Sequence, residues 1–566
     1  MKARIENGVV HSPYPAIDIP ICSIYDLMRE KLLLNPQRIA LVDDKISLTR
    51  GEMLKLLLRY AVGFRQHGVL PGDRICVHLK NSAENLIAMY GCVLAGATIV
   101  LAKSSLTEGE LRYQAQDSDS IHILTDEEQT EKARNATTSL GLKGFFCMGR
   151  SAGFISASEF TAMNERDYEE CPVTDPQNTV IAVCYTSGTT GLPKGAEVTH
   201  YNYVCSFYIR SFFKAWEPND VLLSHSPITH QSGMMYNIFV LLLGATCVVT
   251  RTMLSPLEIM DAVDKYKATG AIFFPAQLQA LVREMQRRGR GLPSMRGIVV
   301  TGSVLKKSLA EDARNTFVGL KNLLNVYAMT ESCGLVFCQA TIDKLHGGTS
   351  VGFPTPMAKA KVLDVKTGEK LGPYETGEIC YCTPSMVKCY YKRLKENEDL
   401  FDKHGWLKSG DCGYYDEDGR FYIVERLKQM IKCMGNQVVP AELEQLLLRE
   451  HRADIAEVSV VGLPNSELGE VPAVAVILTD EGNKCDRQEL AESIKNTVRS
   501  ECYGRTHSTT SGALLLDRVT ERCEMYCFHE LCALDTAFCR THLCTRTHTI
   551  MHAHACTDVQ RERKSS

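Results

Sequence analysis

Helical and strand-like residue patterns alternate along most of this chain, and the alternation limits the folds that it can adopt. Between residues 22 and 350, stretches with apolar residues at helical spacing, such as 52–64, alternate with short runs of β-branched and apolar residues, such as 74–78, 98–101 and 298–301. Strands and helices in alternation pack as layers. The sequence therefore predicts an α/β fold in which layered subdomains form a large N-terminal lobe.

The pattern changes twice towards the C-terminus. Residues 351–422 contain short strand-like runs separated by glycine and proline turns, which predicts a small β-barrel-like unit that closes the large lobe. A polar, lysine-bearing stretch then precedes a helix near 441–449 and a strand near 473–478, which predicts a small α+β lobe on a hinge. We expect an N-terminal domain at 20–424 and a partial C-terminal domain at 425–501.

The last segment, residues 502–566, shows neither helical nor strand periodicity. It holds seven cysteines and six histidines, and its alternation of threonine and histidine is what an ACACAC nucleotide repeat encodes. This indicates a retained intron or a misjoined exon. A Cys/His metal site is the alternative, but the spacings lack the paired pattern of a zinc finger. We predict a divergent, disordered tail.

Composition narrows the range of partners. The chain has 45% hydrophobic residues, 23% charged residues and a formal net charge of −4, which argues against a general electrostatic attraction to nucleic acid and favours small-molecule partners. Sixteen of the 23 cysteines stand singly before residue 501, without zinc-type spacing, and are predicted to be buried thiols. The longest apolar run, 238–249, is shorter than the roughly 20 residues that cross a bilayer, so no transmembrane segment is expected. Because no signal-peptide pattern is present either, we predict an intracellular protein.

The strongest local signal is the run Tyr-Thr-Ser-Gly-Thr-Thr-Gly-Leu-Pro-Lys-Gly at 185–195, directly after a strand-like run at 180–184. Glycines and small hydroxyl residues let backbone N–H and side-chain O–H groups point at one anion, and a lysine adds a positive charge. The run is not a Walker loop, because no Gly-Lys-Ser/Thr follows at the required spacing. A Gly/Thr-rich surface turn is the alternative. The predicted polyphosphate-binding residues are Thr186, Ser187, Gly188, Thr189, Thr190, Gly191 and Lys194.

This run resembles the phosphate loop of the adenylate-forming superfamily, which includes acyl-CoA synthetases, 4-coumarate–CoA ligases, beetle luciferases and peptide-synthetase adenylation domains. Other segments match the family in the same order, so the resemblance covers roughly residues 20–500. The run Pro-Ala-Glu-Leu-Glu at 440–444 is similar to the coumarate-ligase and luciferase-like branch. The resemblance implies ATP, Mg²⁺ and coenzyme A as the small molecules that the protein uses.

The pentapeptide Tyr-Ala-Met-Thr-Glu at 327–331 is similar to the family segment that binds AMP and magnesium. By resemblance, Tyr327 stacks on adenine, Thr330 contacts the α-phosphate, and Glu331 holds Mg²⁺ between the phosphates, with Ala328 and Met329 beside the nucleotide. The chemistry agrees, because an aromatic face suits a purine and a carboxylate suits a hard cation.

Two further motifs flank the expected hinge. The run Trp-Leu-Lys-Ser-Gly-Asp at 406–411 resembles the family motif whose aspartate binds both ribose hydroxyls, which assigns that role to Asp411. The following run, 423–442, resembles the family's hinge motif, which implies that Arg426 also reaches the ribose and that Lys428 marks the hinge. The same resemblance implies that Lys432 and Gly435 belong to the face used for thioester formation. A solvated basic stretch is the alternative for these residues.

The acyl end of the site is predicted from two short motifs. Ser-Pro-Ile-Thr-His at 226–230 resembles the segment that carries a histidine at the carboxylate-binding pocket, which assigns His230. Gly302 and Ser303 resemble a loop that flanks both adenine and the acyl group, and Arg251 is a candidate for the phosphates of coenzyme A.

The resemblance stops near Glu501. The family carries a lysine in a C-terminal Pro-Lys-Thr-x-x-Gly-Lys type motif, which bridges the substrate carboxylate and the α-phosphate during adenylation. After Lys495 the only lysine here is Lys564, without the surrounding motif. The Ser-Lys-Leu-like peroxisomal signal is also absent, which predicts a cytoplasmic location for this sequence and a peroxisomal one for an isoform with a family-like C-terminus.

The implied reaction is ATP-dependent activation of a carboxylic acid, either a phenylpropanoid or a fatty acid, to acyl-AMP, followed by thioester formation with coenzyme A. One alternative is a catalytically impaired isoform that binds ATP and the acid without efficient turnover. Others are a luciferase-like oxidase and an adenylating enzyme that loads a carrier protein. The sequence does not identify the acid or the oligomeric state.

Overall fold

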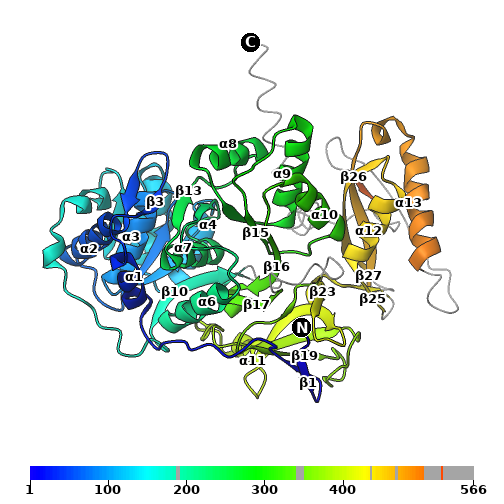
Figure 1. Ribbon diagram of the computed structural model, residues 1–566, viewed down its shortest axis with the longest axis horizontal. Helices are drawn as coiled ribbons and strands as arrows, with labels where there is room; N and C mark the ends of the chain where they lie inside the picture. Colours follow the sequence, from blue (N-terminus) through cyan, green and yellow to red (C-terminus); the bar gives the residue numbers. More distant parts are fainter. Residues whose placement is uncertain (187–191, 340–349, 434–435, 466–468, 503–523, 527–566) are drawn as a thin grey trace, which may run out of the picture. The chain divides into compact units, whose positions relative to one another are not determined.

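The computed structural model describes residues 1–186, 192–339, 350–433, 436–465, 469–502 and 524–526. The chain forms two compact units (Figure 1), of which the first comprises Met1–Ser409 with Tyr414–Tyr422 and the second Gly410–Gly413 with Ile423–Ser566. The division passes through strands β22 (Leu407–Tyr415) and β23 (Phe421–Arg426).

The first large sheet of unit one is mostly parallel. Across the sheet its strands are β21 (Cys389–Tyr390), β11 (Lys194–Thr199), β10 (Val180–Thr186), β6 (Thr98–Leu101), β5 (Arg74–His78), β7 (His122–Asp126), β8 (Gly144–Met148) and β9 (Ile155–Ser156). β5 and β6 are buried along almost their whole length, as expected of parallel strands that are covered on both faces. Because β10, β6 and β5 run parallel, the segments that follow them meet at one edge of the sheet.

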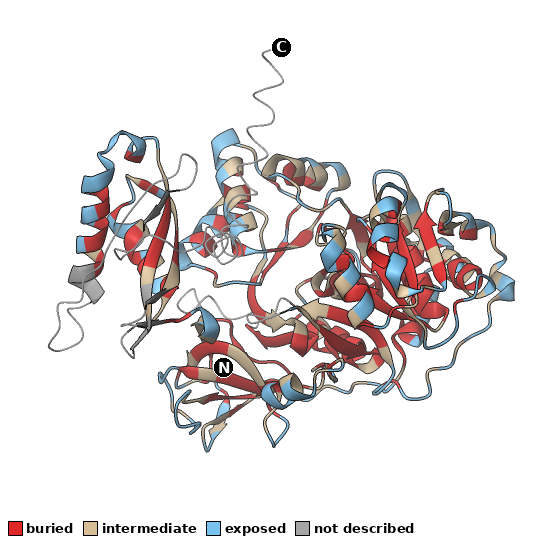
Figure 2. Ribbon diagram, turned by 180° about the vertical axis from the view of Figure 1, so that it is seen from behind, coloured by how far each residue is buried: buried red, intermediate tan, exposed pale blue. Residues whose placement is uncertain are grey.

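The second large sheet has nine strands. In order they are β18 (Phe353–Pro354), β17 (Gly334–Cys338), β16 (Asn322–Met329), β15 (Gly297–Val300), β14 (Gly270–Phe273), β12 (Val221–Ser224), β13 (Thr246–Val249), β3 (Ile39–Val42) and β4 (Ser47–Thr49). Figure 2 shows that the strands of both large sheets are mostly buried, whereas the flanking helices expose their outer faces. The predicted layered α/β fold of the large lobe is confirmed.

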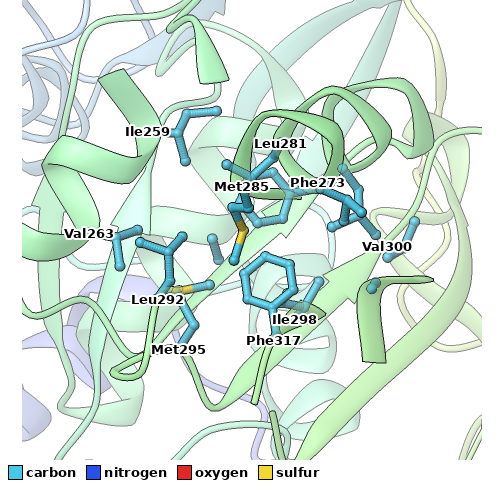
Figure 3. Close-up of a cluster of buried hydrophobic side chains, with 14 of the residues drawn as sticks. Ile259, Val263, Phe273, Leu281, Met285, Leu292, Met295, Ile298, Val300 and Phe317 are labelled. Atoms are coloured by element: carbon cyan, nitrogen blue, oxygen red, sulfur yellow. The ribbon is translucent and has the colours of Figure 1, made fainter. Parts of the chain in front are cut away.

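Three helices pack on the nine-stranded sheet and bury one hydrophobic core, α8 (Pro256–Tyr266), α9 (Pro275–Arg288) and α10 (Lys307–Thr316). Figure 3 shows Phe273 and Ile298 from the strands against Met285 and Phe317 from the helical side. α8 starts where the sequence indicates, because Ser255 forms a capping box with Glu258 and a proline occupies the first turn.

The longest apolar run is divided between a helix and a strand. α7 (Gln231–Leu243) ends at Gly244, whose φ of +82° lies in the left-handed region, and β13 begins two residues later. A Cβ at Gly244 would stand 2.3 Å from Nη2 of Arg50, so the position requires glycine. Among the residues that the structure describes, no helix is long and apolar enough to cross a bilayer.

The small β unit predicted at 351–422 is part of a six-stranded sheet. Its strands are β1 (Arg4–Glu6), β2 (Val9–His11), β19 (Lys359–Leu363), β20 (Gly377–Cys382), β22 and β23, in that order. The two N-terminal strands are not evident in the sequence, because three-residue runs show no periodicity. β2 pairs with β19, whose residues are far away in the chain.

The second unit is a small α+β assembly, as predicted. Strands β25 (Asn436–Val438), β24 (Ile431–Cys433), β27 (Gly469–Leu478) and β26 (Ile455–Asn465) form a sheet in that order. Helices α12 (Pro440–Glu450) and α13 (Arg487–Cys502) contribute Leu443, Leu447 and Ile494 to its core. Strand β28 (Glu524–Tyr526) pairs with β27, and the rest of the predicted tail lies outside the described residues.

Candidate active site

The predicted phosphate loop stands in the sequence between two antiparallel strands, β10 and β11. β10 and β11 pair antiparallel up to Thr186 and Lys194, which face each other in the last register position. Both residues therefore belong to strands and not to a loop, because the ladder extends further than the apolar pattern indicates. The predicted residues Ser187, Gly188, Thr189, Thr190 and Gly191 lie outside the described residues.

Tyr390 lies between the lysine of this hairpin and the predicted magnesium ligand. It belongs to β21, which pairs with β11 so that Tyr390 faces Ala196. Nζ of Lys194 is 5.5 Å from the centroid of the Tyr390 ring, and the Tyr390 hydroxyl donates a hydrogen bond of 2.5 Å to Oε1 of Glu331. One buried phenol ring thus contacts both a cation and a carboxylate. The sequence did not single out Tyr390, because an aromatic residue in a β-rich segment has no distinctive pattern.

The environment of Glu331 suits a magnesium ligand. Its side chain is 7% exposed, and only one of its two carboxylate oxygens takes part in the bond to Tyr390. The described residues contain no group of three or more His, Cys, Asp or Glu side chains that could hold a metal by themselves. Mg²⁺ is commonly bound by one or two carboxylates together with substrate phosphates and water, and Glu331 fits that pattern.

Gln231 joins three segments of the predicted site. Its Oε1 accepts hydrogen bonds from Sγ of Cys184 in β10 and from the hydroxyl of Tyr203, both at 2.8 Å. Its Nε2 donates to Sγ of Cys333, two residues after Glu331, at 3.2 Å. Because Gln231 follows His230 directly, the end of β10, the start of α7 and the Glu331 segment are held together.

His230 is a neutral group at the N-terminus of α7. Its Nδ1 lies 2.7 Å from Oγ of Ser232 and accepts from the Ser232 N–H at 3.4 Å, so His230 caps the helix. Burial, and secondarily the positive charge of Lys103, lowers the pKa of His230 to about 3. At neutral pH a carboxylate here meets an uncharged imidazole, and the nearby cation is Lys103.

Lys103 is a second residue that sequence reasoning missed. Cys184 of β10 faces Leu101, the last residue of β6, in a parallel register, and Lys103 follows β6 by two residues. Lys103 is exposed at this edge of the sheet. It therefore adds positive charge next to the hairpin that carries the predicted phosphate loop.

The predicted adenine residues belong to or follow adjacent strands. Val300, the last residue of β15, faces Asn325 of β16. Gly302 lies two residues after β15, and Tyr327 belongs to β16. Gly302 has a φ of +91°, and a Cβ there would stand 2.4 Å from the Phe274 ring, so only glycine fits. Tyr327 packs on Phe337 with 5.5 Å between ring centroids.

The remaining predicted residues of this segment lie close by. Ser303 is exposed three residues after the end of β15. Ala328 and Met329 end β16, and Thr330 begins a single 3-10 turn (Thr330–Ser332) that also contains Glu331.

The predicted ribose residues pair with each other in the second unit. Nε of Arg426 lies 3.2 Å from Oδ1 of Asp411, whose side chain is buried, while Arg426 is half-exposed. Lys428 is exposed in a 3-10 turn (Leu427–Gln429). Lys432 is in β24, but its side chain lies outside the described residues, as does Gly435.

Arg251 is engaged locally. Its guanidinium pairs with Glu258 and donates to the carbonyls of Thr252 and Met253 at 3.3 Å. A contact with coenzyme A would have to replace these bonds, and the assignment stays a prediction.

Comparison with known proteins decides the family. Residues 28–391 match the AMP-binding enzyme family, a stretch that contains Lys194, Tyr327, Glu331 and Tyr390. The chain belongs to the AMP-binding enzyme family. The predicted membership of the adenylate-forming superfamily is therefore confirmed.

Relatives of this AMP-binding enzyme are adenylate-forming ligases and luciferases. The 4-coumarate--CoA ligase 2 of Nicotiana tabacum is 30% identical over 452 residues, which cover 78% of this chain and 81% of the relative. The luciferin 4-monooxygenase of Photinus pyralis is 28% identical over 483 residues, which cover 83% and 86%.

A solved structure agrees with these relatives. The structure of o-succinylbenzoate CoA synthetase from Bacillus subtilis, in complex with its acyl-adenylate intermediate, is similar with a TM-score of 0.71 and 26% identity, covering 85% of this chain and 92% of that one. This AMP-binding enzyme is thus a member of the adenylate-forming acyl-CoA ligase family, and its lobes follow that fold.

Proposed function

We propose that the protein uses Mg·ATP to activate a carboxylic acid, a phenylpropanoid or a fatty acid, as acyl-AMP and then transfers the acyl group to coenzyme A. The observation that best supports this proposal is Tyr390, whose ring faces Lys194 and whose hydroxyl binds Glu331. A cation for phosphates and a carboxylate for a phosphate-bound metal are thereby held close together, as nucleotide activation requires.

In the first half-reaction an oxygen of the substrate carboxylate attacks the α-phosphorus, and the bond from that phosphorus to pyrophosphate breaks. Lys194 and the hairpin turn bind the phosphates, and Thr330 contacts the α-phosphate. Tyr327 and Gly302 receive the adenine, and Glu331 would hold Mg²⁺, which neutralises phosphate charge. Lys103 is suited to attract the carboxylate towards His230, since it is the cation that affects His230.

In the second half-reaction the thiolate of coenzyme A attacks the acyl carbonyl and AMP leaves. We propose residues 20–424 as the adenylation domain and 425–501 as the partial C-terminal domain, with the hinge at Lys428. Asp411 and Arg426 bind the ribose, and Lys432 and Gly435 serve thioester formation. Arg251 would bind the phosphates of coenzyme A after leaving its ion pair with Glu258.

The divergent ending favours a second candidate, an isoform that binds ATP and acid but turns over poorly. Residues 502–566 lack the lysine motif, whereas the residues matched to adenine and phosphate precede them. Loss of one charge-stabilising group costs about 10²–10³-fold in rate. A luciferase-like activity is the third candidate, because a luciferin 4-monooxygenase is among the relatives.

One experiment separates these candidates. ATP–pyrophosphate exchange and thioester formation are measured with cinnamic, medium-chain and long-chain acids, for this chain and for a version with a family-like, lysine-bearing ending. We expect ATP binding by both chains, weak exchange by the first and strong exchange by the second. Full exchange by the unmodified chain would eliminate the impaired isoform, light emission with luciferin would favour the luciferase, and absence of ATP binding would refute all three.

A further inference from the structure

Two side chains of one helix hold both strands of the β10–β11 hairpin. On the β10 side, the Tyr185 hydroxyl donates a hydrogen bond of 2.8 Å to Oδ2 of Asp117. On the β11 side, the carbonyl of Pro193 accepts a hydrogen bond of 2.7 Å from the Tyr113 hydroxyl. Tyr113 and Asp117 are four residues apart on α4 (Glu108–Asp117), so they lie on the same face of that helix. Both strands of the hairpin are therefore attached to one rigid element.

Arg393 connects these two contacts. Its Nη2 donates to the Tyr113 hydroxyl at 3.2 Å and also to Oδ1 of Asp117. The Tyr113 hydroxyl thus accepts from Arg393 and donates its own proton to Pro193. Each oxygen of Asp117 also has a donor, which is Arg393 for one and Tyr185 for the other. The hydrogen bond with Asp117 raises the pKa of the Arg393 guanidinium, which therefore stays charged and paired.

Arg393 is also fixed relative to Tyr390, the residue whose ring faces Lys194. The side chain of Asn397 accepts a hydrogen bond of 2.7 Å from the Tyr390 N–H and donates one of 2.9 Å to the Tyr390 carbonyl. The backbone N–H of Asn397 donates to the carbonyl of Arg393 at 2.9 Å. Lys194 thus has two restrained neighbours, because Pro193 precedes it in the chain and the Tyr390 ring lies 5.5 Å from its Nζ.

Arg393 and Lys194 differ in what they can offer to a phosphate. Asp117 already neutralises the charge of Arg393. No carboxylate pairs with Lys194 in the described part of the chain, where its Nζ contacts the Tyr390 ring. A lysine without an acidic partner can bind an anion directly, whereas an arginine that is already paired stabilises the groups that it contacts. The two cations therefore have different roles.

We infer that Arg393 is a positioning residue for Lys194 and holds the hairpin where this lysine meets the phosphates of ATP. It acts through Tyr113 and Asp117 and makes no contact with the nucleotide itself. This inference rests on the proposed function, because it concerns how the same site holds its phosphate-binding lysine. A cation that is fixed before the ligand arrives binds more tightly than one that must first be ordered, because less conformational entropy is lost on binding.

The test compares the binding of Mg·ATP and of AMP to the full chain by calorimetry, so that turnover is not required. Arg393→Met should weaken ATP binding about 10-fold, near the contribution of one charge-assisted hydrogen bond, and should change AMP affinity by less than about twofold. Tyr113→Phe should act in the same direction, because the carbonyl of Pro193 loses its donor. Arg393→Lys keeps a positive charge opposite Asp117 and should restore part of the ATP affinity.

A double-mutant cycle shows whether Arg393 acts through Lys194. In a Lys194→Ala protein, Arg393→Met should have almost no further effect on ATP affinity, because no lysine remains to be positioned. The same fold-loss in both backgrounds would overturn the inference. Equal loss of ATP and AMP affinity in Arg393→Met would also overturn it, because a general structural defect weakens both nucleotides.

Arg112→Met is the matched control. Arg112 lies on the same helix and also pairs with a carboxylate, but that partner is Glu108, and its other contacts are with carbonyls of α5 (Thr130–Thr137). It should leave the ratio of ATP to AMP affinity unchanged, and a fall like that in Arg393→Met would contradict the inference. Should Arg393→Met not fold, Tyr113→Phe removes only one oxygen and gives the same comparison. Failure of the parent chain to bind ATP would instead refute the proposed function.

Discussion

Two clusters of polar side chains in the first unit differ in whether their hydrogen-bonding and charged atoms have partners within the protein. In the Lys194–Tyr390–Glu331 group, a lysine faces an aromatic ring and a carboxylate accepts a hydrogen bond from the same residue. The second group consists of two buried residues, Arg210 on helix α6 (His200–Phe212) and Tyr236 on α7. Neither the Nε of Arg210 nor the hydroxyl of Tyr236 has a hydrogen-bond partner among the described residues. Tyr236 lies on α7, and Gln231 at the start of the same helix binds Cys333, two residues after Glu331.

The two clusters therefore differ in how they affect the stability of the folded protein and its activity. A group that is already held in place is preorganised, and its loss removes binding or catalysis with a modest effect on folding. A buried cation without a partner among the described residues weakens the folded protein, because its charge is desolvated without compensation. Substitutions in the two groups should therefore change activity and stability in different ways.

The largest effect is expected for Lys194→Ala. Removing the cation of the phosphate hairpin should lower ATP–pyrophosphate exchange by about 10²–10³-fold, the usual cost of one preorganised charge-stabilising group. Lys388→Ala, which removes an exposed lysine next to β21, is the control and should leave exchange unchanged. A folded Lys194→Ala protein with normal ATP affinity and exchange would remove Lys194 from the site.

Tyr390→Phe tests the group's central residue. It deletes the hydrogen bond to Glu331, and a hydrogen bond to a charged group contributes about 1.5–3 kcal/mol. We expect exchange to fall about 10–100-fold and the Mg²⁺ requirement to rise, as measured by titration of Mg²⁺. Tyr391→Phe is the matched control, because the Tyr391 hydroxyl donates instead to Asp119 on the surface. Equal effects of the two changes would contradict the role of Tyr390.

Arg210→Met and Arg50→Met should change stability in opposite directions. Replacing the unpaired Arg210 should raise the free energy of unfolding of the ligand-free protein by about 1–3 kcal/mol, since a buried charge is removed. Replacing Arg50 should lower it by about 1–3 kcal/mol, because two backbone carbonyls lose their donor. Denaturant unfolding measures both values, and a destabilising Arg210→Met would show that the guanidinium is satisfied within the chain.

The effect that is smallest near neutral pH concerns a buried histidine outside the site. Burial lowers the pKa of His200 to about 4, from an ordinary value of 6.5, and its Nδ1 has no partner in the described structure. Between pH 6.5 and pH 4 the unfolded chain binds this proton and the folded protein does not. Stability is therefore complete above pH 6.5 and falls as the pH drops, by up to about 1.4 kcal/mol per pH unit for one such group.

His200→Gln should reduce the slope of unfolding free energy against pH by that amount. His404→Gln, at an exposed position, is the control and should leave the slope unchanged. An unaltered slope in His200→Gln would mean that His200 takes up its proton in the folded protein.

The sequence alone determined the elements that depend on local pattern. The strands expected at 74–78 and 98–101 have the same bounds in the structure, because both are buried along nearly their whole length and read as continuous runs. The hairpin motif at 185–195 indicated a phosphate site, and the order of motifs indicated the family. All of these signals involve residues that are close in the chain, so they can be read without a fold.

Only the tertiary structure revealed the partners of individual side chains. Tyr390 binds Glu331 across 59 residues and Gln231 binds Cys333 across 102, and neither pair has a pattern in the sequence. Arg210 reads as an ordinary charged residue on a helix until packing shows that it is buried with no acidic partner among the described residues. The physical reason is that periodicity and turn chemistry act over a few residues, whereas burial and hydrogen-bond satisfaction depend on which distant segments the folded chain brings together.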